Sequence, residues 1–227
     1  MGDEMRRWLA VILCICLLPI PVGAKTETKY IALTFDDGPS GRFTRRLLEG
    51  LESRGVRATF LLCGYRIKIY PELTKQICDA GHEIGLHGYS HNNMSKMTPA
   101  QLRQELKDTL RLLPKSCQVN FLRPPGGQCN AAVSQVAKQF DLSLLLWSVD
   151  PKDWENHDAK AVQTAVVSNV KNADVILLHD MSDSSVDAAL AIVDTLLAQG
   201  YRFVTASELS RMQGKTLLPG AEYKHFR

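Results

Sequence analysis

KYIALTFDDGPSG, residues 29–41, runs from an apolar stretch into two adjacent carboxylates and a Gly-Pro turn. The alternating run at its start is typical of a strand. Asp36 and Asp37 repel each other when both are ionised, and neighbouring residues on an extended strand point to opposite sides. Gly38 and Pro39 therefore have to turn the chain if both carboxylates are to serve one site.

Outward from this stretch, strand-like and helix-like segments alternate along the chain. The strand-like segments are apolar almost throughout, which predicts parallel strands buried on both faces, as in a barrel or a doubly wound sheet. We expect seven strands, at residues 30–35, 57–64, 82–87, 120–124, 142–150, 174–180 and 201–206. We expect helices at residues 41–55, 70–80, 98–113, 130–140, 158–170 and 185–200.

The helix expected at residues 98–113 has the clearest signals. Thr98 can cap its start, Pro99 suits the first helical position, and Gln101 completes a capping box. Leucines spaced by three or four residues predict its buried face: Leu102, Leu106, Leu110 and Leu113.

The first 24 residues have the pattern of a secretory signal peptide. Arg6 and Arg7 precede an apolar run from Trp8 to Ile20, and a small-residue Val-Gly-Ala exit follows. The run is shorter than the roughly 18 residues that a spanning helix needs. We therefore expect cleavage after Ala24 and no membrane span afterwards, with the protein secreted or held in the cell envelope.

The length of 227 residues suits one domain, which we assign to residues 25–212. Residues 213–227 lack periodicity and are expected to form a surface tail. The net charge is only +3 and the Lys and Arg residues are spread along the chain. Without a basic block, nucleic acid is not an expected partner. We expect a monomer.

Four cysteines lie beyond the predicted signal peptide, and four cysteines allow three pairings. Cys63 follows a predicted strand and Cys78 lies in the next helix, so these two can form one disulfide. Cys117 with Cys129 is the competing pair. All four could also be small buried thiols. No CxxC spacing is present among them, so we do not expect a cysteine metal site.

Polar residues follow most of the predicted strands directly. They are Asp36 and Asp37, His87, Arg123, Asp150 and Asp153, and His179. In a (β/α) barrel the carboxyl ends of the strands share one face, and that face carries the active site. Residues more than a hundred positions apart in the chain would then converge.

Two histidines spaced by four, His87 and His91, can face one point if Gly88 lets the segment HGYSH curl. Alone, surface or capping histidines explain this spacing equally well, and an Asp-Gly turn explains the adjacent carboxylates. Together, an Asp-His-His set with one open position is the catalytic zinc arrangement. A water at that position becomes acidic, and the cation offsets the repulsion between Asp36 and Asp37.

His179 ends a predicted strand of Val, Ile and Leu. A histidine there can be a hydrogen-bonded core residue. On the rim of a metal site it could instead protonate a leaving nitrogen, for which histidine is suited near neutral pH.

Five segments in order resemble the motifs of the polysaccharide deacetylase (NodB-homology) family, carbohydrate esterase family 4. They are TFDDGP, HGYSH, RPPGG, DPKDW and LLH. The resemblance extends from about Tyr30 to Leu209. It implies a distorted (β/α) barrel and metal-dependent removal of acetyl groups from polysaccharide, usually from N-acetylglucosamine units.

The resemblance also implies a role for each matching residue. Asp36 would be the catalytic base, oriented by Arg123, and His179 the catalytic acid, tuned by Asp153. Asp37, His87 and His91 would bind the metal, with Zn²⁺ first and Co²⁺ or a similar divalent ion as the alternative. Trp154 and Leu177 would form the apolar pocket for the acetyl methyl group.

One position departs from the family pattern: Gly126 stands where many members have Tyr. The backbone N–H there is implied to hold the tetrahedral oxyanion, and glycine retains that donor. We therefore expect a changed substrate preference rather than lost activity.

The sequence thus predicts a secreted polysaccharide N-deacetylase acting on peptidoglycan-like or chitin-like sugars. Removal of O-acetyl esters, as on xylan, is the first alternative. A catalytically silent carbohydrate-binding module on the same fold is the second.

Overall fold

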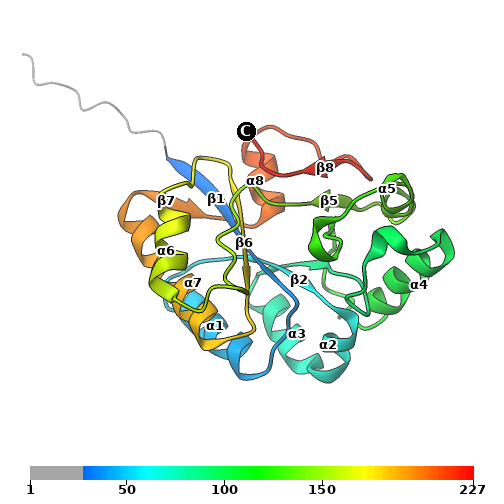
Figure 1. The fold of residues 1–227 in the computed structure, drawn as a ribbon, viewed down its shortest axis with the longest axis horizontal. Helices are drawn as coiled ribbons and strands as arrows, with labels where there is room; N and C mark the ends of the chain where they lie inside the picture. Colours follow the sequence, from blue (N-terminus) through cyan, green and yellow to red (C-terminus); the bar gives the residue numbers. More distant parts are fainter. Residues whose placement is uncertain (1–27) are drawn as a thin grey trace, which may run out of the picture.

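The computed structural model describes residues 28–227, in which helices surround a curled sheet (Figure 1). The strands are β1 (Lys29–Asp36), β2 (Thr59–Leu62), β3 (Glu83–Leu86), β4 (Phe121–Leu122), β5 (Ser143–Leu145), β6 (Val175–His179), β7 (Tyr201–Phe203) and β8 (Glu222–Tyr223). The α-helices are α1 (Arg42–Glu52), α2 (Gly64–Ile69), α3 (Pro71–Asp79), α4 (Pro99–Leu110), α5 (Ala131–Gln139), α6 (Ala159–Val167), α7 (Asp183–Ala198) and α8 (Ala206–Met212). Two short 3₁₀ turns cover Met94–Lys96 and Pro125–Gly127.

The seven expected strands are all present and pair in parallel, which confirms the distorted barrel. The sheet runs β6-β1-β2-β3-β4-β5-β8, and β7 pairs with the first residues of β1. Beyond β5 the chain leaves the sheet, but Val149 makes a parallel bridge to Ile176 of β6. The sheet therefore curls, so that the chain after β5 returns to β6, the strand at the other edge of the sheet.

The strand register brings distant polar residues to one end of the barrel. Asp36 stands directly beside His179 in the pairing of β1 with β6. The N–H of His87 donates to the Leu62 carbonyl at the end of β2, and that of Arg123 to the Leu86 carbonyl at the end of β3. The expected convergence at the carboxyl ends of the strands is thus realised.

The core follows from the apolar composition of the strands. Six consecutive residues of β1, Ile31 to Asp36, are buried, as a parallel strand covered on both faces should be. Phe35 and Phe60 stack with ring centroids 5.2 Å apart. Leu47 and Leu51 of α1 cover this cluster from outside.

The capping box of α4 is confirmed, with Thr98 accepting from the Gln101 N–H and Gln101 accepting from the Thr98 N–H. Helices α2 and α8 were not expected, since each is shorter than two helical turns and is too short for a clear sequence period. The predicted signal peptide lies outside the described residues. Among residues 28–227, no helix is long and apolar enough to span a membrane.

The expectation that residues 213–227 form a surface tail is wrong for its last part. β8 extends the sheet by pairing with β5, and Phe226 is only 1% exposed. Tyr223 stacks on Phe226 with centroids 5.5 Å apart. A two-residue strand followed by one buried ring has no periodicity for a sequence pattern to reveal.

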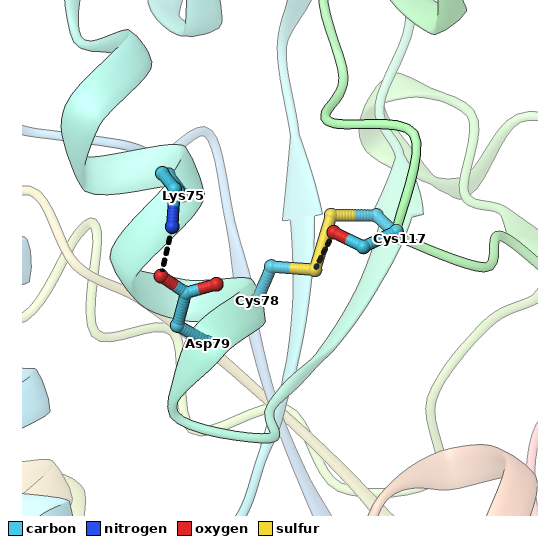
Figure 2. The surroundings of a disulfide bond; sticks show 5 residues. Lys75, Cys78, Asp79 and Cys117 are labelled. Carbon is cyan, nitrogen blue, oxygen red and sulfur yellow. Dashed lines mark hydrogen bonds and ion pairs between the residues drawn. A yellow bond between two sulfur atoms is a disulfide. The ribbon is translucent and has the colours of Figure 1, made fainter.

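Neither expected disulfide pair forms; Cys78 is bonded to Cys117 instead (Figure 2). Cys63 follows β2 and Cys129 follows β4, so both lie toward the face that holds the carboxyl ends of the strands. Cys78 is near the end of α3 and Cys117 follows α4, so both helices have carried the chain back to the opposite face. The alternation of strand and helix thus separates the two expected partners in each pair.

Candidate active site

Both adjacent carboxylates serve one pocket because the chain turns between them. Asp36 is the last residue of β1 and is 3% exposed. Asp37 has φ 73°, a left-handed conformation that Asp tolerates better than most residues. The carbonyl of Gly38 accepts from the Cys63 N–H at 3.1 Å, which ties the turn to the end of β2. The expected rotation of one carboxylate therefore takes place at Asp37 itself.

Arg123 fixes Asp36 from behind the pocket. Its guanidinium is fully buried and donates to Asp36 Oδ1 at 2.6 Å and to Thr34 Oγ1 at 2.8 Å. It also donates to the carbonyls of Leu145 at 2.7 Å and Leu146 at 2.9 Å. Burial lowers the pKa of Arg123, and the Asp36 carboxylate opposes that shift. The second carboxylate oxygen of Asp36 is left available to the pocket.

Asp37, His87 and His91 form a compact set whose candidate ligand atoms all lie within 4.8 Å of one another. Asp37 Oδ1 is 3.3 Å from His87 Nε2 and 3.0 Å from His91 Nε2. Among the described residues, this buried oxygen has no hydrogen-bond partner. An unpartnered anionic oxygen between two imidazole nitrogens is the environment that a divalent cation would satisfy.

The backbone fixes which nitrogen of His87 faces this set. His87 Nδ1 lies 2.7 Å from the Arg123 carbonyl oxygen, which can only accept, so Nδ1 carries the proton. Nε2 is then the free lone pair, as a metal ligand requires. Burial acts to raise the pKa of Asp37, but the neighbouring imidazoles His87 and His91 lower it well below its usual range. The set therefore combines an ionised carboxylate with a correctly oriented imidazole.

Glu105 holds the curl that brings His91 back toward His87. Gly88 has φ 77°, and the Glu105 carboxylate accepts from the N–H groups of Tyr89 at 2.6 Å and Ser90 at 2.9 Å. Glu105 was not predicted as a site residue, since in the sequence it is one of several polar positions of α4. The side chains of Asp37, His87 and His91 nevertheless converge on one point.

Asp153 fixes His179 in a similar way. One carboxylate oxygen accepts the His179 backbone N–H at 2.9 Å, and the other lies 2.9 Å from Nδ1 of the ring. Burial alone would lower the pKa of His179, but Asp153, with smaller contributions from Asp36 and Asp37, raises it to about 9. This shift favours the protonated imidazole at neutral pH, the form in which a histidine can act as an acid.

The predicted site residues surround a pocket of about 390 Å³. It is lined by Asp36, Asp37, His87, His91, Gly126, Trp147, Asp150, Trp154, Leu177 and His179. Arg123 and Asp153 stand behind this lining, fully or almost fully buried. Leu177 forms part of the floor at 3% exposure, and Trp154 is 58% exposed at the rim.

Trp147 lines the pocket but was not predicted as a site residue. It follows β5 within a run that gives only a strand signal. Its ring packs so near Gly127 that a Cβ at that position would come within 2.7 Å of it. A contact between a glycine after β4 and an aromatic ring after β5 leaves no local mark in the sequence.

A family model described as polysaccharide deacetylase matches residues 23–145. A peptidoglycan-N-acetylglucosamine deacetylase from Bacillus cereus is 41% identical over 189 residues, 81% of this chain and 89% of that protein. Two further relatives, from Bacillus subtilis and Listeria monocytogenes, are longer, and this chain covers 42% and 43% of their lengths.

Solved structures agree with these matches. The "T48 deacetylase with substrate" superposes with a TM-score of 0.81 at 35% identity, covering 87% of this chain and 97% of that chain. A family 4 acetyl xylan esterase from Clostridium thermocellum, solved with a cobalt ion, also gives 0.81, at 32% identity and 87% and 98% coverage. Given the barrel, the motifs gathered at one pocket and these similarities, the chain belongs to the polysaccharide deacetylase family, carbohydrate esterase family 4.

Proposed function

We propose that this protein is an exported, metal-dependent N-deacetylase that removes acetyl groups from N-acetylglucosamine-type sugars of a peptidoglycan-like or chitin-like polysaccharide. The observation that carries the proposal is the arrangement around one pocket of a base held by Arg123, a three-residue ligand set and an acid held by Asp153. The peptidoglycan deacetylase among the relatives supports the substrate class.

Asp37, His87 and His91 would hold one divalent cation. Their mixture of carboxylate and imidazole ligands suits Zn²⁺, and Co²⁺ is compatible with the same set. When bound, such a cation acts as a Lewis acid and lowers the pKa of water. The cobalt ion named for the acetyl xylan esterase supports a divalent cation in this fold.

The chain's own groups divide the proton transfers. Asp36, with one oxygen fixed by Arg123, accepts the proton of the attacking water through its other oxygen. His179 donates its proton to the sugar nitrogen as the carbon–nitrogen bond breaks. Trp154 and Leu177 contact the acetyl methyl group, and the Gly126 backbone N–H stabilises the charge on the carbonyl oxygen.

A protonated His179 would meet the requirement of amide hydrolysis. An amine is a poor leaving group unless its nitrogen is protonated, whereas an alkoxide leaves with less help. Asp153 raises the pKa of His179 to about 9, which favours the protonated imidazole at neutral pH. O-acetyl ester hydrolysis remains the second candidate because the acetyl xylan esterase is a structural relative.

Acetate release tests the proposed reaction. Purified protein, loaded with Zn²⁺ or Co²⁺, is given N-acetylglucosamine oligomers, peptidoglycan and O-acetylated xylan. We expect release from an N-acetylated glycan that chelation abolishes. Release from xylan alone would assign the ester reaction, and no release from any of them would leave a binding module.

The Asp36→Asn variant distinguishes the proposed catalytic base from the proposed metal ligands. The amide cannot accept the proton of water, so we expect turnover to fall roughly 10²–10⁴-fold with metal content unchanged. His91→Ala, by contrast, should lose bound metal and activity together. Metal analysis alongside acetate release measures both, and near-normal turnover in Asp36→Asn would assign the base to another group.

A further inference from the structure

The wall of the pocket at Gly126 is open, and one side chain borders the opening. Gly126 has φ 65°, and a Cβ built there would meet only Gln128 Nε2, at 4.0 Å. Gly126 lines the same pocket as the ligand set. The missing side chain therefore leaves space next to the reacting centre, with the Gln128 amide at its edge.

The hydrogen bonds around Gln128 determine which end of its amide faces this space. The Ser95 backbone N–H, which can only donate, lies 3.0 Å from Asn93 Oδ1. The other end of the Asn93 amide is therefore its NH₂ group, which donates to Gln128 Oε1 at 2.8 Å. Since the Gln128 oxygen is turned toward Asn93, its NH₂ group is the end beside Gly126.

This donor is held by two loops that are joined to each other. Asn130 Nδ2 donates to the Ser95 carbonyl at 2.9 Å, while Asn130 Oδ1 caps α5 by accepting the Val133 N–H at 2.9 Å. Met94, between Asn93 and Ser95, is 1% exposed and anchors its loop in the core. Gln128 is thus exposed yet oriented in advance, which lowers the entropy lost when it binds a ligand.

We propose that Gln128 is a specificity-determining residue, whose NH₂ group donates to a carboxylate or carbonyl on a bulky sugar substituent lying in the space left by Gly126. The lactyl ether on O3 of a muramyl residue has this chemistry: it needs room, and its carboxyl oxygens only accept. An unsubstituted hydroxyl, as in chitin oligomers, fills no such space. The inference rests on the proposed function and narrows its substrate class to muramyl-containing glycans.

The test compares two tetrasaccharides, (GlcNAc)₄ and (GlcNAc-MurNAc)₂ with free lactyl carboxylates. Dissociation constants are measured by calorimetry in metal-loaded Asp36→Asn protein, and KM and kcat in the active protein. Gln128→Leu keeps the shape but removes the donor, so we expect about tenfold weaker binding of the muramyl glycan, as for a lost hydrogen bond to a charged group. Binding of (GlcNAc)₄ should change less than twofold.

Gln128→Glu is the sharper variant. One carboxylate oxygen can still accept from Asn93, so the loop contact survives, but the other places negative charge beside the lactyl group. We expect it to weaken muramyl binding further than Gln128→Leu, through KM and not kcat. Gln139→Leu, on an exposed position of α5, is the matched control and should leave both glycans unaffected.

The two proposals fail separately. Absence of acetate release from both tetrasaccharides and from peptidoglycan would remove the N-deacetylase assignment, whereas the binding data would still decide the role of Gln128. Equal losses on both glycans would mean that Gln128 only supports the loop. If neither variant weakened binding of the muramyl glycan, or if the wild-type protein did not prefer that glycan, the inference would be overturned.

Discussion

At the residue scale, the two neighbouring aspartates differ because their surroundings differ. Asp36 ends a strand and faces a fully buried arginine, while Asp37 takes a left-handed conformation and faces two imidazoles. That both carboxylates serve one site could be predicted, because they stand at the carboxyl end of a strand. Which oxygen stays free could not, because Thr34, Leu145 and Leu146 also share the arginine.

Asp153→Asn should move the alkaline limit of activity. Asp153 is the partner that raises the pKa of His179 to about 9, against the effect of burial. With a neutral amide, that pKa should fall by roughly 2–3 units, toward or below the ordinary value of about 6.5. The midpoint of the alkaline decline in kcat/KM should fall by the same amount, which pH profiles of the two proteins measure.

The same substitution should change stability in a defined pH window. Because the pKa of His179 is raised on folding, its contribution is full below about pH 6.5 and is lost as the pH rises through about 9. Denaturant unfolding of metal-free protein should show the largest difference between wild type and variant near pH 6, of order 3 kcal/mol. Asp158→Asn, which keeps the cap of α6, is the control, and a gap that stayed constant up to pH 10 would contradict the linkage.

At the element scale, the alternation of strand and helix decides which side chains can meet. Loops after strands lie on the face of the pocket, and loops after helices lie on the opposite face. Sorting the cysteines by the face on which they lie would have indicated Cys78 with Cys117. Pairing by closeness in sequence failed because Cys63 and Cys78 lie at opposite ends of neighbouring elements.

Cys78→Ser together with Cys117→Ser should destabilise the fold without affecting the pocket. The bond closes a loop of 39 residues between α3 and the segment after α4. A loop of that length corresponds to about 4 kcal/mol of lost chain entropy in the unfolded state. Unfolding by urea measures the change, and addition of a reductant to the wild type should reproduce it.

Cys129→Ser is the matched control, since this thiol is free and half-buried. It should change the free energy of unfolding by far less than the double variant does. The acetate-releasing activity of the double variant, assayed well below its unfolding temperature, should stay near that of the wild type. A double variant as stable as the control would mean that the bond contributes little.

At the scale of the whole molecule, the barrel could be predicted because the main strands are apolar almost throughout and are separated from one another by helices. The parts that were missed are short: α2, α8 and β8 each carry too few residues for a period to emerge. Trp147 and Gln128 were missed for a different reason. Their importance depends on which loop the fold places opposite them, and that information is spread over distant segments.

We predict that the last residues of the chain stabilise the barrel. Phe226 is 1% exposed and packs with the β1, β2 and α8 cluster that includes Ala32, Leu61 and Leu209. Its N–H donates to the Ala173 carbonyl at 2.9 Å. Phe226→Ala leaves a ring-sized cavity there, so we expect a loss of about 3–5 kcal/mol in the free energy of unfolding.

Leu218→Ala provides the contrast within the same segment, because Leu218 is 58% exposed. Its truncation removes little buried surface and should cost less than about 0.5 kcal/mol. Thermal and urea unfolding of the two variants compare them directly. If both changed stability equally little, residues 213–227 would behave as the surface tail that their lack of periodicity suggested, and the pairing of β8 with β5 would add nothing to the stability of the fold. If only Phe226→Ala is destabilising, the segment is part of the core.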